Sequence, residues 1–215
     1  MGGAQWVVEK IMREDRPGTE RVAAFSDGVI AIIITIMVLE LKLPEHMADH
    51  SIWGGILQPV ATRLSAYVLS FFVVAVMWGN HHAILRTAPY VSPGLLWANA
   101  HLLFWMSLIP FTTHLLGEGP RYPGHVAVYG FVLFASAVGF ALLRLVIVRQ
   151  VEGAEHAPQS HHRGVLRRSW LGIALYVASM PLAYWSVWAS LAIFCIVPVV
   201  FYLPGLFRRG GASPS

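Results

Sequence analysis

A carboxylate followed directly by a long apolar segment is the first feature of this sequence that could support chemistry. Asp27 ends the stretch Arg21-Val-Ala-Ala-Phe25-Ser26-Asp27, and the next charged residue is Glu40. A charged side chain at the centre of a membrane helix costs roughly 2.5 to 3.5 kcal/mol on insertion scales, so it usually has a polar partner or a role in transport. The sequence therefore predicts one of these two roles for Asp27.

Histidine is the second residue type that could support chemistry. Four histidines in the second and third apolar segments could hold a haem or a metal ion between helices: His81, His82, His101 and His114. A six-helix transporter or redox membrane protein therefore stays open as an alternative. No Cys-x-x-Cys-His motif occurs, and neither a Gly-x-Ser-x-Gly elbow nor paired carboxylates accompany Ser26-Asp27, so we expect no enzyme and no cofactor.

The composition predicts an all-α membrane protein that would position these residues. Hydrophobic residues make up 56% of the 215 residues, charged residues 12%, and the mean hydropathy is +0.61. The apolar stretches approach the 20 residues that a helix needs to cross a bilayer. We predict six transmembrane helices at approximately 20–43, 59–82, 92–116, 123–148, 166–184 and 187–206.

The distribution of positive charge predicts the orientation of these helices. Most of the 15 Lys and Arg residues fall in the N-terminal segment, the second and fourth connections and the C-terminus. Such asymmetry places both termini in the cytoplasm of a multi-pass inner-membrane protein. We predict a cytoplasmic segment 1–19, a transmembrane domain 20–207 and a cytoplasmic tail 208–215. The net charge of +4 then reflects topology, and no nucleic-acid partner is expected.

The first predicted helix has one face that could line a conduit. Helical spacing places five residues on this face: Gly28, Ile32, Thr35, Ile36 and Leu39. Periodicity alone leaves two interpretations open, because the same face could contact lipid or a neighbouring helix. The six-helix unit occurs once, so a pore lined by this helix would need other copies of the chain, and we expect a symmetric homo-oligomer.

Three short motifs resemble the transmembrane protein 175 family of potassium channels. They are Arg21-x-x-x-Phe25-Ser26-Asp27 in the first helix, Trp78-x-x-His81-His82 in the second, and Asn99 followed by Pro110-Phe111-x-Thr113 in the third. Their order and joint presence make the match specific. The resemblance implies a homotetrameric, K⁺-selective channel of the single-repeat, prokaryotic kind.

The resemblance also implies roles for the residues of the first helix. Ile32 matches the family's hydrophobic constriction, with Ile36 and Leu39 as further narrow rings and Thr35 as the hydroxyl between them. Apolar rings that expel water force an ion to lose part of its hydration, and K⁺ loses its shell more readily than Na⁺. The permeant K⁺ would pass near Ile32 and Thr35. No series of arginines at every third position appears, so we expect a leak-type channel without steep voltage gating.

The polar motif residues suit a network that joins the first three helices. Unpaired polar groups are costly in a low-dielectric interior, so hydrogen bonds among them would hold the bundle together. Attraction of cations by Asp27 at the mouth of the pore stays open as an alternative. The predicted network consists of Arg21, Phe25, Ser26, Asp27, Trp78, His81, His82 and Asn99.

Overall fold

The computed structural model describes residues 17–41, 57–118, 122–152 and 159–207, and their regular structure is helical throughout. The predicted N-terminal segment, apart from residues 17–19, and the predicted C-terminal tail lie outside these residues. The elements are α2 (Pro17–Ile36), the 3₁₀-helix η1 (Met37–Glu40), α3 (Gln58–Leu85), α4 (Pro93–Ser107), α5 (Ile109–Gly117), α6 (Pro123–Glu152), α7 (Gln159–Leu182) and α8 (Val187–Phe207). The predicted all-α class is confirmed.

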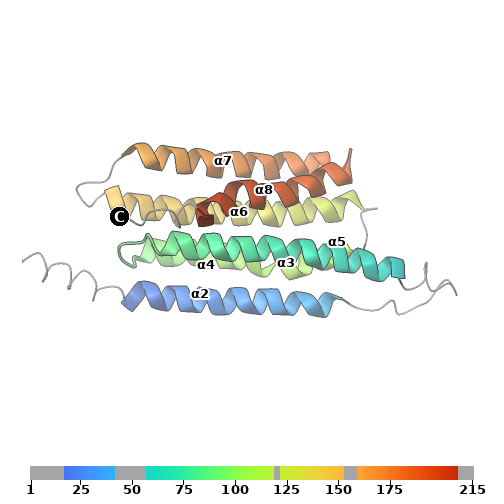
Figure 1. Ribbon diagram of the computed structural model, residues 1–215, viewed down its shortest axis with the longest axis horizontal. Helices are drawn as coiled ribbons and strands as arrows, with labels where there is room; N and C mark the ends of the chain where they lie inside the picture. The colour runs from blue at the N-terminus through green and yellow to red at the C-terminus, as the bar shows by residue number, and fades with distance from the viewer. Residues whose placement is uncertain (1–16, 42–56, 119–121, 153–158, 208–215) are drawn as a thin grey trace, which may run out of the picture.

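The helices run roughly parallel to one another and form six rods, because α4 and α5 follow each other almost without interruption (Figure 1). Helix α2 lies at one edge of the bundle and α7 at the opposite edge. Helix α2 packs on α3, α4 and α5, whereas α7 packs on α6 and α8. The helix that carries Asp27 therefore has neighbours on one side, and its opposite side is uncovered in the single subunit.

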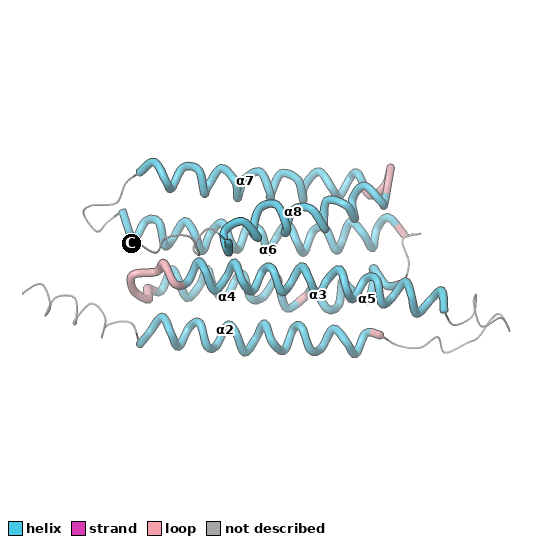
Figure 2. The backbone as a smooth tube through the Cα atoms, viewed as in Figure 1, coloured by secondary structure: helices cyan, strands magenta, loops and turns pink. Residues whose placement is uncertain are grey.

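Two predicted spans differ locally from regular α-helix. The first narrows to a 3₁₀ turn at Met37–Glu40 instead of continuing as α-helix to residue 43. The third breaks at Leu108, between α4 and α5, and the break is visible as a short loop segment in Figure 2. Pro110 lies in the first turn of α5, and its missing N–H suits a helix start better than a helix interior. The third span is therefore two helices in line.

The last two predicted spans are also helical, as α7 and α8. Four helical segments are long and apolar enough to cross a bilayer among the residues with described side chains: Gly18–Glu40, Val60–Leu85, Pro93–Gly117 and Pro123–Val151. Within α7 and α8, the apolar stretches with described side chains are Trp170–Leu182 and Val187–Val200. Helix α7 begins at Gln159, before the predicted membrane span at 166. Arginine and histidine near its start are polar, so they limit membrane insertion, but both are compatible with a helix.

The core lies where α4 and α6 approach each other closely. Gly139 on α6 faces Leu102 on α4, and a Cβ atom at Gly139 would lie 2.9 Å from the Leu102 Cα atom. Leu102 and its neighbour Met106 are fully buried. This contact fixes α4 against α6, so α4 offers α2 a rigid surface to pack on.

Candidate functional site

Helix α2 and the 3₁₀-helix η1 that continues it, together called the first span below, have a buried face and an exposed face, and these two faces define the candidate site. Ile30, Ile33 and Met37 are almost completely buried, with at most 3% exposure, and belong to the hydrophobic core. On the other side, Ile32 is 57% exposed and Leu39 is 67% exposed. The apolar character of α2 is therefore not explained by packing within the subunit alone.

The exposed face contains all five residues of the predicted stripe: Gly28, Ile32, Thr35, Ile36 and Leu39. Thr35 has a defined orientation, because its Oγ1 donates to the carbonyl oxygen of Ala31 or of Ile32, each at 3.0 Å. Its proton is thus bound to the backbone, and lone pairs of the hydroxyl oxygen stay available to an exposed cation.

A buried hydrogen-bond chain joins the N-terminal half of α2 to α3 and α4. Asn99 on α4 donates through Nδ2 to Ser26 Oγ at 2.9 Å, and its Oδ1 lies 2.8 Å from Nε2 of His81 on α3. The Ser26 hydroxyl in turn donates to the Val22 carbonyl at 2.8 Å. Ser26 and His81 are fully buried and Asn99 is 3% exposed. We call Ser26, His81 and Asn99 the amide network.

Asp27 forms a separate contact beside the amide network. The Trp78 indole N–H donates to Asp27 Oδ1 at 2.8 Å, which ties α2 to α3. The His82 ring lies against Trp78, with ring centroids 6.2 Å apart. The remaining two motif residues are not brought into this cluster: the Arg21 and Phe25 side chains are exposed, and Arg21 has no ion pair with any described residue.

The C-terminal end of α2 is held by different chemistry. Met37 is fully buried, and its Sδ lies 3.9 Å from the Thr113 hydroxyl of α5. The Thr113 hydroxyl also lies 2.8 Å from Ser70 Oγ, which is 3.1 Å from the hydroxyl of Tyr129. We call Thr113, Ser70 and Tyr129 the hydroxyl chain. It connects α5, α3 and α6 behind the end of α2.

A histidine–carboxylate contact lies next to the hydroxyl chain but closer to the surface. His114 Nδ1 is 3.0 Å from Glu40 Oε2, and the two side chains are 33% and 27% exposed. The sequence alone assigns no role to Glu40, Ser70 or Tyr129. A single polar residue in an apolar span indicates that a hydrogen-bond partner is needed. It does not identify which residue on another helix is that partner.

The histidines considered as haem or metal ligands each contact a different residue. His81 is bonded to Asn99, His114 lies against Glu40, and His101 packs edge-on against Trp105 at 6.2 Å. Across the part of the chain that the structure describes, no three His, Cys, Asp or Glu side chains are grouped so that they could hold a metal ion. No observation in this region favours a haem or metal centre over the hydrogen-bonding roles.

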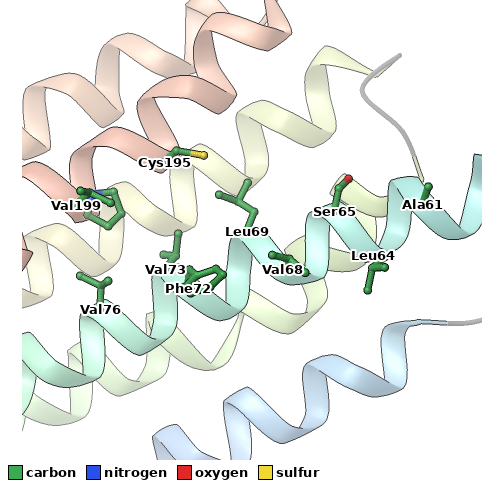
Figure 3. Close-up of a pocket in the computed structure, with 11 residues that line it drawn as sticks. Ala61, Leu64, Ser65, Val68, Leu69, Phe72, Val73, Val76, Cys195 and Val199 are labelled. Atoms are coloured by element: carbon green, nitrogen blue, oxygen red, sulfur yellow. The ribbon is translucent and has the colours of Figure 1, made fainter.

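Two open cavities lie along the sides of the helical bundle. One, of about 570 Å³, lies between α2 and α5 and includes Ile32, Ile36 and Glu40 in its wall. The other, of about 620 Å³, lies between α3 and α8, where Cys195 and Val199 face the α3 side chains (Figure 3). The walls of this second cavity are almost entirely apolar, which suits contact with lipid rather than with an ion.

Comparison with known proteins places this geometry in context. Residues 21–110 match the model of the family described as the endosomal/lysosomal potassium channel TMEM175. A potassium channel of Chryseobacterium sp. strain P1-3 is 38% identical over 86% of this chain and 92% of its own length. A potassium channel of Chamaesiphon minutus is 30% identical over 86% of this chain and 94% of its own length.

A solved structure has the same fold. The crystal structure of a lysosomal potassium-selective channel TMEM175 homologue from Chamaesiphon minutus superposes with a TM-score of 0.73 and 28% sequence identity. The match covers 87% of this chain and 97% of that chain.

Proposed function

The chain belongs to the TMEM175 family of potassium channels, and from this premise we propose that it conducts K⁺ through a homotetrameric pore lined by α2. The observation that carries the proposal is the uncovered stripe of α2, which a single subunit leaves facing away from its own core. Rotational symmetry would bring four such stripes together around one axis. A pore of this kind is incomplete without the other copies.

The stripe suits a hydrophobic constriction. Successive rings of Ile32, Ile36 and Leu39 would narrow the path and oppose a continuous column of water. An ion would then lose part of its hydration shell, which costs K⁺ less than Na⁺. Thr35 lies between these rings with its proton bonded to the backbone, so its oxygen could replace some of the lost water ligands.

Asp27 and the amide network have a mainly architectural role in this proposal. The Asp27 carboxylate accepts a hydrogen bond from Trp78, and Ser26 is buried against Asn99. These contacts set the rotation of α2 about its own axis, which decides which side chains face the pore. Along the helix Asp27 precedes Ile32 by about 7.5 Å.

The remaining properties follow from topology and charge. We propose that the channel is an inner-membrane, multi-pass protein with both termini in the cytoplasm, residues 20–207 forming the channel domain, and lipids around it. No arginine series of a voltage sensor occurs in the sequence, so the current is expected to be of leak type. Its action is passive conduction, and the proposal includes neither catalysis nor a cofactor.

Electrical recording of reconstituted protein tests the constriction. Ile32→Asn places four amides in the proposed waist, so we expect a severalfold larger single-channel conductance and a smaller preference for K⁺ over Na⁺. The measurement is the current and the reversal potential in planar bilayers under a K⁺/Na⁺ gradient.

Val38→Asn is the matched control for this experiment. Val38 is 48% exposed on the same helix but lies outside the stripe. We expect this variant to conduct like the original protein. Unchanged currents in Ile32→Asn, or equal changes in both variants, would contradict the assignment of Ile32 to the constriction. A coupled, saturating flux in place of passive current would contradict the channel itself.

A further inference from the structure

The open cavity of about 570 Å³ between α2 and α5 lies directly beside the stripe of the first span that the proposed function places at the pore. Ile32 and Ile36 belong both to this stripe and to the cavity wall, and Ser107 and Phe111 line the cavity from α4 and α5. We propose that this cavity is a subunit interface that receives the α2 helix of an adjacent copy of the chain. The inference rests on the proposed function, because it concerns how the subunits of that pore contact one another.

The side of α2 that faces α3, which we call the α3 side, is the part of the adjacent copy that would enter the cavity. Asp27 marks this side, because it bonds to Trp78 of α3. Ala24 and Ala31 lie three residues before and four residues after Asp27, so they share its side of the helix, and both are exposed. Ala31 and Ile36 are about 140° apart around the helix axis, so the α3 side and the cavity are separate surfaces of one α2.

A closed ring of subunits brings these two surfaces together. Each contact in such a ring joins one surface of a subunit to a different surface of the next subunit. With the stripe of every subunit facing the axis, the α3 side of one α2 faces the cavity of its neighbour at the same depth in the membrane. The alanines allow two helix backbones to approach closely, and the cavity offers the space. An unfilled cavity would instead leave the proposed pore side chains open to lipid.

Two exposed charges in the first turns of α2 are complementary across the same contact. Glu20 lies seven residues before Asp27 and therefore on the α3 side, whereas Arg21 lies eleven residues before Ile32 and therefore in line with the stripe. Neither forms an ion pair with a described residue. Successive residues on a helix do not face each other, so the two do not pair within one α2. Arg21 of one subunit and Glu20 of the next subunit would meet between the two helices.

This pair also explains how arginines can lie in line with a cation pathway. Four unpaired arginines around the pore axis would repel K⁺. A carboxylate from each adjacent subunit would neutralise them, whereas a single subunit offers Arg21 no carboxylate partner among its described residues. The signs of the two charges therefore favour a second copy of the chain over a lipid as the occupant of this surface.

Cross-linking between differently tagged subunits tests the contact. Both chains carry Cys195→Ala, because Cys195 is the only cysteine of the sequence and is exposed. One chain then carries Ala31→Cys and the other carries Ser107→Cys, which is exposed on the cavity wall. The two chains are co-expressed, purified in detergent and treated with a flexible bismaleimide. We expect a covalent product that carries both tags, which only a contact between subunits can give.

The two positions are matched in depth and have a matched control. Ala31 and Ser107 each lie about midway between the amide network and the level of Thr113, so fourfold symmetry keeps them at similar depth. In the control, Ala178→Cys replaces Ser107→Cys. Ala178 is also exposed, but it belongs to α7 at the opposite edge of the bundle (Figure 1). We expect several times less of the two-tag product from this combination.

Exchange of the two charges tests the contact by a different measurement. Glu20→Arg and Arg21→Glu each place like charges across the proposed contact, so we expect a severalfold smaller tetramer fraction in native mass spectrometry. The double variant restores opposite charges at every contact and should assemble like the original protein. Arg149→Glu is the matched control, because Arg149 is an exposed arginine in the last turn of α6, and it should leave assembly unchanged.

The possible results separate this interface from the channel proposal on which it rests. The two-tag product, together with rescue by the double charge variant, supports the interface. A native tetramer in which Ala31 and Ser107 cross-link no better than the Ala178 control would overturn the interface and leave the pore proposal intact. A double charge variant that assembles as poorly as the single variants would also overturn it. A monomeric original protein would remove the proposed pore itself, and with it this interface.

Discussion

The two ends of α2 are held by different kinds of contact. At the N-terminal half, the amide network joins three helices through side chains that are at most 3% exposed. At the C-terminal end, Met37 is held by packing and the neighbouring Glu40–His114 pair is about one-third exposed. The first half of α2 is thus fixed by directional hydrogen bonds between buried side chains, and the second half by apolar packing and a partly exposed histidine–carboxylate contact.

This difference predicts different costs for breaking each end. A buried amide that loses its partners leaves donors and acceptors that water cannot reach, and each costs roughly 1 to 3 kcal/mol. An exposed ion pair contributes only about 0 to 1 kcal/mol, because water and salt replace its interaction. Breaking the amide network should therefore cost more than breaking the Glu40–His114 contact, while the burial of Met37 still holds the C-terminal end in place.

The largest effect is expected for Asn99→Ala. This change removes both bonds of the central residue and leaves His81 Nε2 and the Ser26 hydroxyl oxygen without the partner they have in the bundle. We expect a loss of about 2 to 4 kcal/mol of stability. In thermal unfolding of the detergent-solubilised protein this corresponds to a fall in Tm on the order of 10 °C.

His101→Ala is the control for this prediction, because His101 is exposed on the same helix. Its Tm should stay close to that of the original protein. If Asn99→Ala and His101→Ala unfold at the same temperature, the amide network does not hold the N-terminal half of α2, and the contrast between the two ends is lost.

An intermediate effect is expected for Thr113→Val, which keeps the shape of the side chain and removes its hydroxyl. Ser70 and Tyr129 can still bond to each other, so only one link of the hydroxyl chain is lost. We expect a cost of about 1 kcal/mol, measured by thermal unfolding.

Thr112→Val is the matched control for Thr113→Val. Thr112 is equally buried on α5, but its hydroxyl bonds only to carbonyl groups of its own helical segment. It should cost less than Thr113→Val. The reverse order would show that the hydroxyl chain contributes nothing beyond local helix bonding.

Much of the fold could be predicted from the sequence, because membrane helices need long apolar runs. The runs in α2, α3 and α6 identify these helices to within a few residues. Helix α7 begins at Gln159, before the predicted membrane span at 166, because arginine limits membrane insertion but not helix formation. The 3₁₀ turn at Met37–Glu40 has no signal in hydropathy, since it depends on how the end of α2 meets α5.

The candidate site was less predictable than the fold. Motif order named Ser26, Asp27 and Asn99, but not the contacts that each one makes. The contacts depend on how far each helix is rotated and shifted against its neighbours, which no single span encodes. For the same reason the contact between Glu40 and His114 could not be predicted, because the two residues lie far apart along the chain. The sequence offered His114 only as a candidate metal ligand.

The smallest effect is expected for Glu40→Gln. The amide keeps a hydrogen-bonding oxygen within reach of His114 Nδ1 and removes only the charge, and the 3.0 Å pair is already open to solvent. We expect a change in stability of less than about 1 kcal/mol that becomes smaller still at high KCl concentration, measured by thermal unfolding at low and high salt. Glu118→Gln removes the more distant carboxylate, 3.7 Å from His114 Nε2, and serves as the control. A loss in Glu40→Gln as large as that in Asn99→Ala would mean that α2 is fixed equally at both ends. A small, salt-dependent loss would show that the Glu40–His114 contact contributes little to holding the C-terminal end of the proposed pore helix, which then depends on the packing of Met37.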